Sequence, residues 1–152
     1  MNVHAVQYSP VWQDRAANRQ RIQTLLHAAP PTPGSLLVLP EMALTGFNLH
    51  PSQTLPDWQT DLEFFQHLAR EHRCAVIAGG VRPTASPSPT PAENVAWVIL
   101  PDGEVKATYV KQRPFSLGEE HRVHVAGTAS IVVEYGGFRL APQICYDLRF
   151  PE

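Results

Sequence analysis

The sequence has few cysteines, no long apolar run and no N-terminal signal, and each shortage excludes a class of protein. Two cysteines, Cys74 and Cys145, are too few for a disulfide framework, and no Cys-x-x-Cys spacing indicates zinc. No apolar stretch is long enough to span a bilayer, and no basic segment followed by an apolar one resembles a secretory signal. Free thiols in a chain without a signal favour a cytoplasmic protein.

Charge is scarce as well. Charged residues make up 17% of the chain, the net charge is −2, and neither Lys nor Arg forms a run. This balance predicts no electrostatic attraction to nucleic acid or to a membrane surface. What is present fits a globular protein, because 152 residues of which 43% are hydrophobic can build one core but hardly two domains. Fifteen prolines, about twice the average share, predict many abrupt turns.

The first half of the chain alternates predicted strands and helices. Strands are predicted over residues 2–8, 36–39 and 74–79, and helices over 15–29, capped by Asp14, and over 60–73. The run Leu36–Leu39 shows no alternation, which is typical of a strand buried on both faces. The order strand, helix, strand, helix, strand predicts an α/β fold with helices on the face of a sheet.

Hairpins replace this alternation in the second half. Residues 82–93, rich in Pro, Ser and Thr, are predicted to form an exposed loop. Residues 94–100 and 104–111 read as strands joined by the turn Pro101–Gly103. Residues 130–135 and 138–144 read as a second hairpin through Gly136 and Gly137, with an irregular stretch over 112–129 between the two.

Three reactive residues each stand at the end of a predicted strand. Glu41 follows the strand 36–39, Lys111 closes 104–110, and Cys145 closes 138–144. Ligand sites of α/β sheets form beyond the strand ends, where loops leave the rigid scaffold. Hydrolysis of an amide needs such a set: a thiolate to attack the carbonyl, a base to move protons, and a cation to stabilise the oxyanion.

Each of these residues also has an ordinary structural interpretation. A lone cysteine such as Cys145 is often a small buried hydrophobe, and glutamates and lysines after strands are often solvated. Cys74 lies within an apolar segment and is interpreted as core packing. His121 and His124 are spaced to share one face, but no third ligand completes a metal site. All seven histidines are therefore predicted to be surface or loop residues.

The surrounding sequence favours the catalytic interpretation. The segments Leu39–Gly46, Tyr109–Phe115 and Ile144–Glu152 resemble, in order and spacing, the three signature regions of the nitrilase superfamily. These carbon–nitrogen hydrolases have a Glu-Lys-Cys triad. The last segment is most similar to the omega-amidase branch, which hydrolyses the terminal amide of 2-oxo-acid amides. The resemblance covers essentially the whole chain.

The resemblance implies specific roles. Glu41 would be the general base, Lys111 the oxyanion stabiliser and Cys145 the nucleophile that forms a thioester. The backbone N–H of Tyr146 would complete the oxyanion hole. The sequence departs from the family at Gln112–Phe115, where relatives often carry histidine and leucine before the phenylalanine, and this departure concerns substrate contacts more than the triad.

Two further positions keep alternatives open. Many relatives use a second glutamate in the loop after the lysine, and here Glu120 is favoured over Glu119. Arg149 could pair with a substrate carboxylate, since its planar guanidinium suits that role, or form a structural ion pair with Asp147 or Glu152.

The resemblance also sets the expected architecture. It implies the N-terminal portion of a four-layer αββα sandwich, so residues 1–152 would form a single, incomplete domain that lacks the C-terminal part. It implies a small-molecule amide substrate, no cofactor and no metal. Full-length relatives are expected to be homodimers through helices beyond residue 152. The alternatives are a catalytically silent truncated fragment and a nitrilase-like binding module.

Overall fold

The computed structural model describes residues 1–85 and 92–150. Five strands of these residues form one sheet in the order β1-β2-β3-β4-β5. Strands β1 (Val3–Ala5), β2 (Leu36–Val38) and β3 (Ala75–Pro83) are parallel. Strands β4 (Ala92–Ile99) and β5 (Val105–Val110) continue the sheet as an antiparallel hairpin. The chain thus follows the predicted α/β alternation and then the predicted hairpin.

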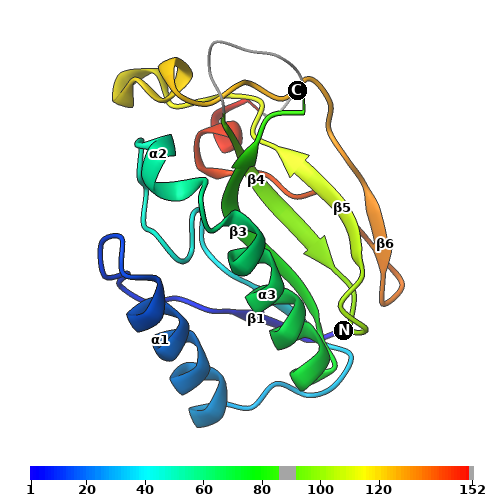
Figure 1. Cartoon of the computed structure of the whole chain (residues 1–152). Helices are drawn as coiled ribbons and strands as arrows, with labels where there is room; N and C mark the ends of the chain where they lie inside the picture. The colour runs from blue at the N-terminus through cyan, green and yellow to red at the C-terminus, as the bar shows by residue number, and fades with distance from the viewer. Residues whose placement is uncertain (86–91, 151–152) are drawn as a thin grey trace.

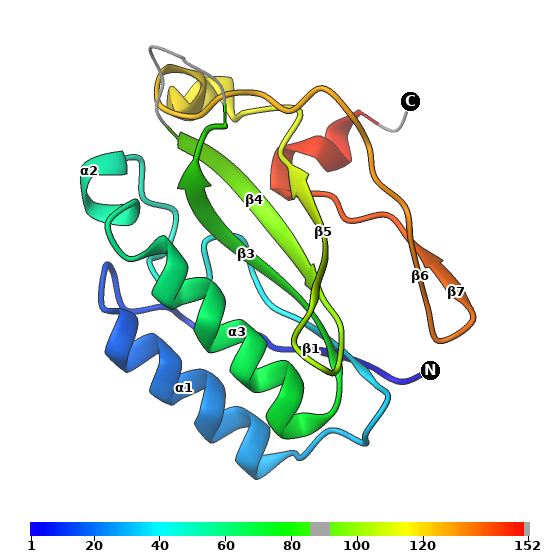
Figure 2. The same ribbon diagram turned by 45° about the vertical axis from the view of Figure 1, so that its right-hand side comes forward.

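Two long helices lie side by side on one face of the sheet (Figures 1 and 2). They are α1 (Arg15–Ala28) and α3 (Trp58–His72), and both were expected from the sequence. The side chain of Asp14 caps α1 by accepting a hydrogen bond of 2.9 Å from the backbone N–H of Ala17, as predicted. A short helix, α2 (Pro51–Thr54), was not expected. In the described residues no helix has both the length and the apolar character needed to cross a membrane.

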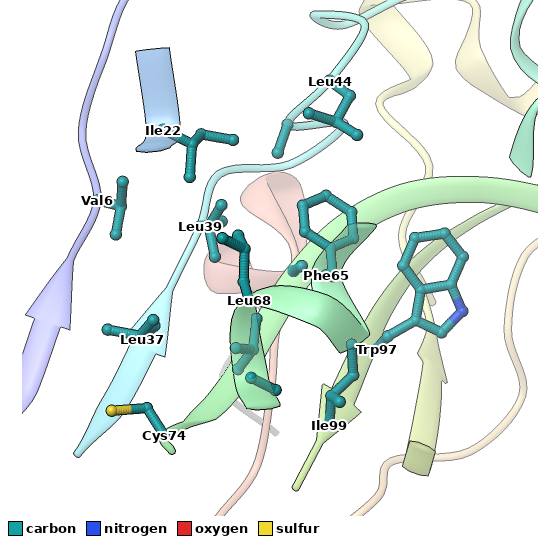
Figure 3. Packing of buried hydrophobic residues seen from close by; sticks show 14 of the residues in the cluster. Val6, Ile22, Leu37, Leu39, Leu44, Phe65, Leu68, Cys74, Trp97 and Ile99 are labelled. Carbon is teal, nitrogen blue, oxygen red and sulfur yellow. The ribbon is translucent and has the colours of Figure 1, made fainter. Parts of the chain in front are cut away.

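The core fills the space between the helices and the sheet (Figure 3). Phe65 and Leu68 of α3 and Ile22 of α1 are fully buried against Leu37 of β2. Cys74 belongs to the same cluster and is 0% exposed, which confirms that it is core packing. Burial of so many large apolar side chains on one face fixes the sheet as a rigid support for the loops at its ends.

The opposite face of the sheet is covered less completely. The hairpin β6 (Val133–Tyr135) and β7 (Phe138–Leu140) lies on the side away from α1 and α3 (Figure 2). Ile144 packs there against Tyr109 of β5. Val38 and Ile77 are half-buried on this face, whereas Leu36 of β2 is 4% exposed, so the expectation that β2 is buried on both faces is met in part.

The structure corrects several predicted boundaries. The first strand, predicted over residues 2–8, spans only Val3–Ala5, and the strand predicted from residue 130 begins at Val133. Residues 82–93 are not one loop, because Arg82 pairs with Glu93 across β3 and β4 and the two side chains form a 2.7 Å ion pair; residues 86–91 lie outside the described residues. The strand predicted over 138–144 ends at Leu140. Pro142 has no N–H for a strand ladder, which accounts for the early end, and a short 3₁₀ helix then spans Cys145–Arg149.

Candidate active site

Glu41 stands on a turn that lies against β3. The backbone N–H of Ala43 donates to the carbonyl of Gly79 at 3.0 Å. A Cβ on Gly79 would lie 2.5 Å from the Pro40 carbonyl oxygen and 2.6 Å from the Cα of Glu41. Only a glycine allows this close approach, so Gly79 sets the position of the turn and of the Glu41 carboxylate.

Lys111 follows β5 directly and is almost fully buried, with 1% exposure. Its ammonium donates to Glu41 Oε1 at 2.7 Å and to Glu120 Oε2 at 2.8 Å. Burial by itself lowers the pKa of Lys111, but the hydrogen bonds and charges of the two glutamates outweigh burial and raise it. Lys111 is therefore held as a cation.

Glu120 is the most enclosed member of the site and is 0% exposed. Its Oε2 also accepts from the backbone N–H of Phe115 at 2.7 Å, and its Oε1 accepts from the Asn94 amide at 2.7 Å. Burial opposes ionisation, yet these bonds and Lys111 lower the pKa of the Glu120 carboxyl. Glu119, the alternative considered from sequence, is exposed and pairs with Arg122 at 3.0 Å. The structure thus brings Glu120, not Glu119, to Lys111.

Asn94 is a site residue that the sequence did not reveal. Its side-chain amide donates to both Glu41 Oε1 and Glu120 Oε1, each at 2.7 Å, and so joins the two carboxylates that hold Lys111. All eight residues of β4 are buried. A polar amide within an otherwise largely apolar strand is the signal that could have identified it, because buried polar groups need partners.

His124 corrects the prediction that every histidine is a surface or loop residue. It is 2% exposed, and its Nδ1 lies 3.7 Å from Glu120 Oε1. Neither ring nitrogen has a hydrogen-bond partner among the described residues. Burial lowers the pKa of His124, with Lys111 acting in the same direction and Glu120 against it. The side chain was misassigned because its burial depends on the fold of residues 116–124 and not on local pattern. His121 is exposed, as predicted.

Cys145 does not close a strand but opens the turn after an extended segment. Its φ of +48° is a left-handed conformation, which is rare outside glycine and presents the side chain on a sharp bend. The residue is exposed, while Ile144 before it is buried. Partial desolvation of the thiol, followed by the negative charge and hydrogen bonding of Glu41, raises the pKa of Cys145, and Lys111 opposes the shift. The thiol therefore needs a base, and Glu41 lies next to it.

Tyr146 and Arg149 extend from the same turn. The Tyr146 ring packs edge-on against Phe115 and Phe150, with centroids 5.3 and 5.4 Å apart. Arg149 is exposed. Of the two ion-pair partners considered for Arg149, Asp147 forms no ion pair with it within residues 1–85 and 92–150. The other, Glu152, lies outside the described residues.

Taken together, the site holds one cation between two carboxylates beside a thiol. Lys111 with Glu41 and Glu120 carries one net negative charge, which suits proton abstraction from Cys145. Across the described part of the chain no group of three or more His, Cys, Asp or Glu residues is placed to hold a metal ion. The arrangement can perform nucleophilic chemistry with its own base and cation.

Comparison with known proteins places this geometry in a family. The carbon–nitrogen hydrolase family model matches residues 2–152. The omega-amidase YafV of Yersinia enterocolitica is 35% identical over 142 residues, which cover 93% of this chain and 52% of that protein. The 2-oxoglutaramate amidase of Bacillus subtilis is 30% identical over 119 residues, covering 77% of this chain and 45% of that protein. The chain spans about half the length of these relatives.

Solved structures share the fold. XC1258 from Xanthomonas campestris, a CN-hydrolase superfamily protein with an arsenic adduct in its active site, has a TM-score of 0.85 and 29% identity over 98% of this chain and 54% of its own. An amidase from Nesterenkonia sp. has a TM-score of 0.83 at 23% identity, over 99% of this chain and 57% of its own. The family match, the omega-amidase relatives and the observed α/β architecture agree with the three sequence motifs. The chain belongs to the carbon–nitrogen hydrolase family, within the nitrilase superfamily and similar to its omega-amidase branch.

Proposed function

We propose that residues 1–152 belong to one carbon–nitrogen hydrolase domain and that its site hydrolyses a small-molecule amide in the manner of an omega-amidase, releasing ammonia and a carboxylic acid. The observation that carries the proposal is the Lys111 ammonium held by Glu41 at 2.7 Å and Glu120 at 2.8 Å, beside the Cys145 thiol. Burying a cation between two carboxylates carries a desolvation cost, and such clusters of perturbed ionisable groups gather at functional sites.

In the acylation step the Cys145 sulfur attacks the amide carbonyl carbon as its proton passes to Glu41. A C–S bond forms and the carbonyl oxygen becomes an oxyanion, which Lys111 and the backbone N–H of Tyr146 stabilise. The C–N bond then breaks, and the amine takes the proton back from Glu41 and leaves as ammonia. Because the pKa of Cys145 is raised by desolvation and by Glu41, proton transfer accompanies attack and no preformed thiolate is required.

In the deacylation step a water molecule hydrolyses the thioester. Glu41 removes a proton from the water as the C–O bond forms. The C–S bond then breaks, and the departing Cys145 sulfur takes that proton from Glu41, which restores the thiol and the carboxylate and releases the acid. Glu120 holds Lys111 in place throughout, because its own bonds to Asn94 and the Phe115 N–H fix its carboxylate. Its lowered pKa keeps it ionised.

Arg149 is the proposed recognition group for the substrate carboxylate. It is exposed and lies four residues after Cys145 on the same turn. A guanidinium pairs with a carboxylate through two hydrogen bonds. A 2-oxo-acid with a terminal amide carries such a carboxylate at the far end from the scissile bond. Arg149→Gln is expected to raise KM for this substrate and to change KM little for an amide without the carboxylate.

The test is ammonia release from glutaramate-type and 2-oxo-acid amides. The proposal predicts turnover that Cys145→Ala abolishes and that Cys74→Ala retains, since Cys74 is 0% exposed in the core. Release no greater than that of Cys145→Ala refutes hydrolysis by this polypeptide. Substrate binding that persists in Cys145→Ala without any turnover in the unmodified chain would instead indicate a binding module.

A further inference from the structure

Asp147 has a set of contacts that the proposed chemistry does not use. It is 3% exposed, although it lies on the turn that presents the exposed Cys145. Its Oδ2 accepts from the Ile144 N–H at 3.0 Å and from the Tyr109 hydroxyl at 2.8 Å, and its Oδ1 accepts from the Arg113 N–H at 2.8 Å. Burial of a carboxylate is costly, and these three donors offset that cost, so they fix the position of the Asp147 side chain.

One of these contacts, together with a backbone hydrogen bond of Asp147, encloses Cys145 within its own turn. The Asp147 carboxylate accepts from the Ile144 N–H, and the Asp147 N–H donates to the Ile144 carbonyl at 3.0 Å. Cys145 and Tyr146 lie between these reciprocal bonds. They hold Cys145 at its φ of +48°, a conformation that a non-glycine residue keeps only when its surroundings impose it.

The other two contacts reach to either side of Lys111. Tyr109 lies two residues before Lys111 and Arg113 two residues after it. Tyr109 lies in β5 and Lys111 follows that strand directly, with its backbone N–H still donating to the Asn94 carbonyl of β4 at 2.9 Å. Because side chains alternate along an extended backbone, the Tyr109 and Lys111 side chains project to the same side. One carboxylate therefore ties the turn of the nucleophile to both flanks of the cation, across 38 residues of sequence.

We propose that Asp147 is a positioning residue that sets the Cys145 sulfur and the Tyr146 N–H relative to Lys111 and Glu41. The inference rests on the proposed function for its catalytic consequence. Its structural content, the register between the nucleophile turn and the end of β5, does not depend on turnover. A positional error of about 1 Å in such a constellation can lower the rate about 100-fold.

Asparagine at this position keeps the shape and loses one acceptor. Its single carbonyl oxygen can serve either the Ile144 N–H and the Tyr109 hydroxyl or the Arg113 N–H, so its amide nitrogen must face a backbone donor. Asp147→Asn should therefore loosen the turn without emptying space. Tyr109→Phe removes only the hydroxyl donor and is the milder variant.

The experiment measures the pH dependence of Cys145 alkylation by iodoacetamide, resolved from Cys74 by peptide mass spectrometry, together with urea unfolding. Asp61→Asn is the matched control, because Asp61 is a buried carboxylate paired with Arg15 and Arg19 on the helical side. Asp147→Asn is expected to lower the alkylation midpoint by about 0.5 pH units or more, as the thiol moves away from Glu41 and into solvent. Tyr109→Phe should shift it in the same direction by less.

Asp61→Asn should lower the urea midpoint while leaving the alkylation midpoint unchanged. An Asp147→Asn protein that loses stability but keeps the wild-type alkylation midpoint overturns the positioning role. If Asp147→Asn does not fold, an unchanged alkylation midpoint in Tyr109→Phe overturns it instead. With an active chain, Asp147→Asn should lower kcat at least about tenfold with a smaller change in KM. A shifted alkylation midpoint in a chain that never releases ammonia refutes the hydrolase proposal and leaves the positioning role standing.

Discussion

Replacement of Glu120 by glutamine tests whether the buried charge cluster forms as described. In Glu120→Gln the side chain keeps its volume but loses its charge and one acceptor oxygen. The carboxylate accepts from Lys111, from the Phe115 N–H and from Asn94. If the remaining carbonyl takes the place of Oε2, the new amide nitrogen faces the Asn94 amide, and two donors then meet.

The cost follows from these contacts. Removing one partner of a buried ion pair costs about 3–5 kcal/mol, and a hydrogen bond to a charged group contributes about 1.5–3 kcal/mol. Lys111 retains Glu41 at 2.7 Å, which places the expected loss near the lower limit, about 3 kcal/mol. With an m-value of about 2 kcal/mol/M, the urea midpoint should fall by about 1.5 M.

Glu119→Gln is the control because it makes the same chemical change one residue away. Glu119 is exposed and its partner Arg122 is exposed too, so the variant should cost less than about 0.5 kcal/mol. The lowered pKa of Glu120 adds a signature: its stabilisation is present above the unfolded pKa of about 4.3 and is lost as pH falls through the folded pKa. The Glu119→Gln and Glu120→Gln proteins should therefore converge in stability only when the pH falls below the lowered folded pKa of Glu120. Equal urea midpoints for Glu119→Gln and Glu120→Gln at pH 7 would refute the cluster.

Three other variants test neighbouring features. Burial lowers the pKa of His124, so below about pH 6.5 the unfolded chain binds a proton that the folded chain does not, and stability should fall as the pH drops. His124→Phe should flatten the pH dependence of the urea midpoint. An unchanged pH dependence contradicts the burial of a neutral His124. Gly79→Ala places a Cβ 2.5 Å from the Pro40 carbonyl oxygen, which should lower the free energy of unfolding by about 1–3 kcal/mol and displace Glu41. A thermal unfolding midpoint within about 1 °C of wild type would argue against the close approach. Glu41→Gln should lower the pH midpoint of Cys145 alkylation, because the carboxylate raises the pKa of the thiol; a rise in the midpoint would exclude this coupling.

Local sequence signals predicted the elements well where a local cause operates. The Asp14 cap and the turn Pro101–Gly103 act within a few residues, and the structure confirms both. Predictions of element boundaries were wrong where pairing with a distant strand sets the boundary. Arg82 and Glu93 are strand residues because they pair with each other, which composition alone does not reveal.

The sequence by itself determined the reactive residue types, their order and their family, because the three motifs are contiguous and each can be read in isolation. Only the tertiary structure decided which groups meet. Lys111 contacts a glutamate 70 residues before it and another 9 residues after it, and Asn94 reaches both through the register of β4 on β5. The burial of His124 and the threefold bonding of Asp147 arise in the same way, since strand register and loop packing bring together donors and acceptors that no local pattern connects.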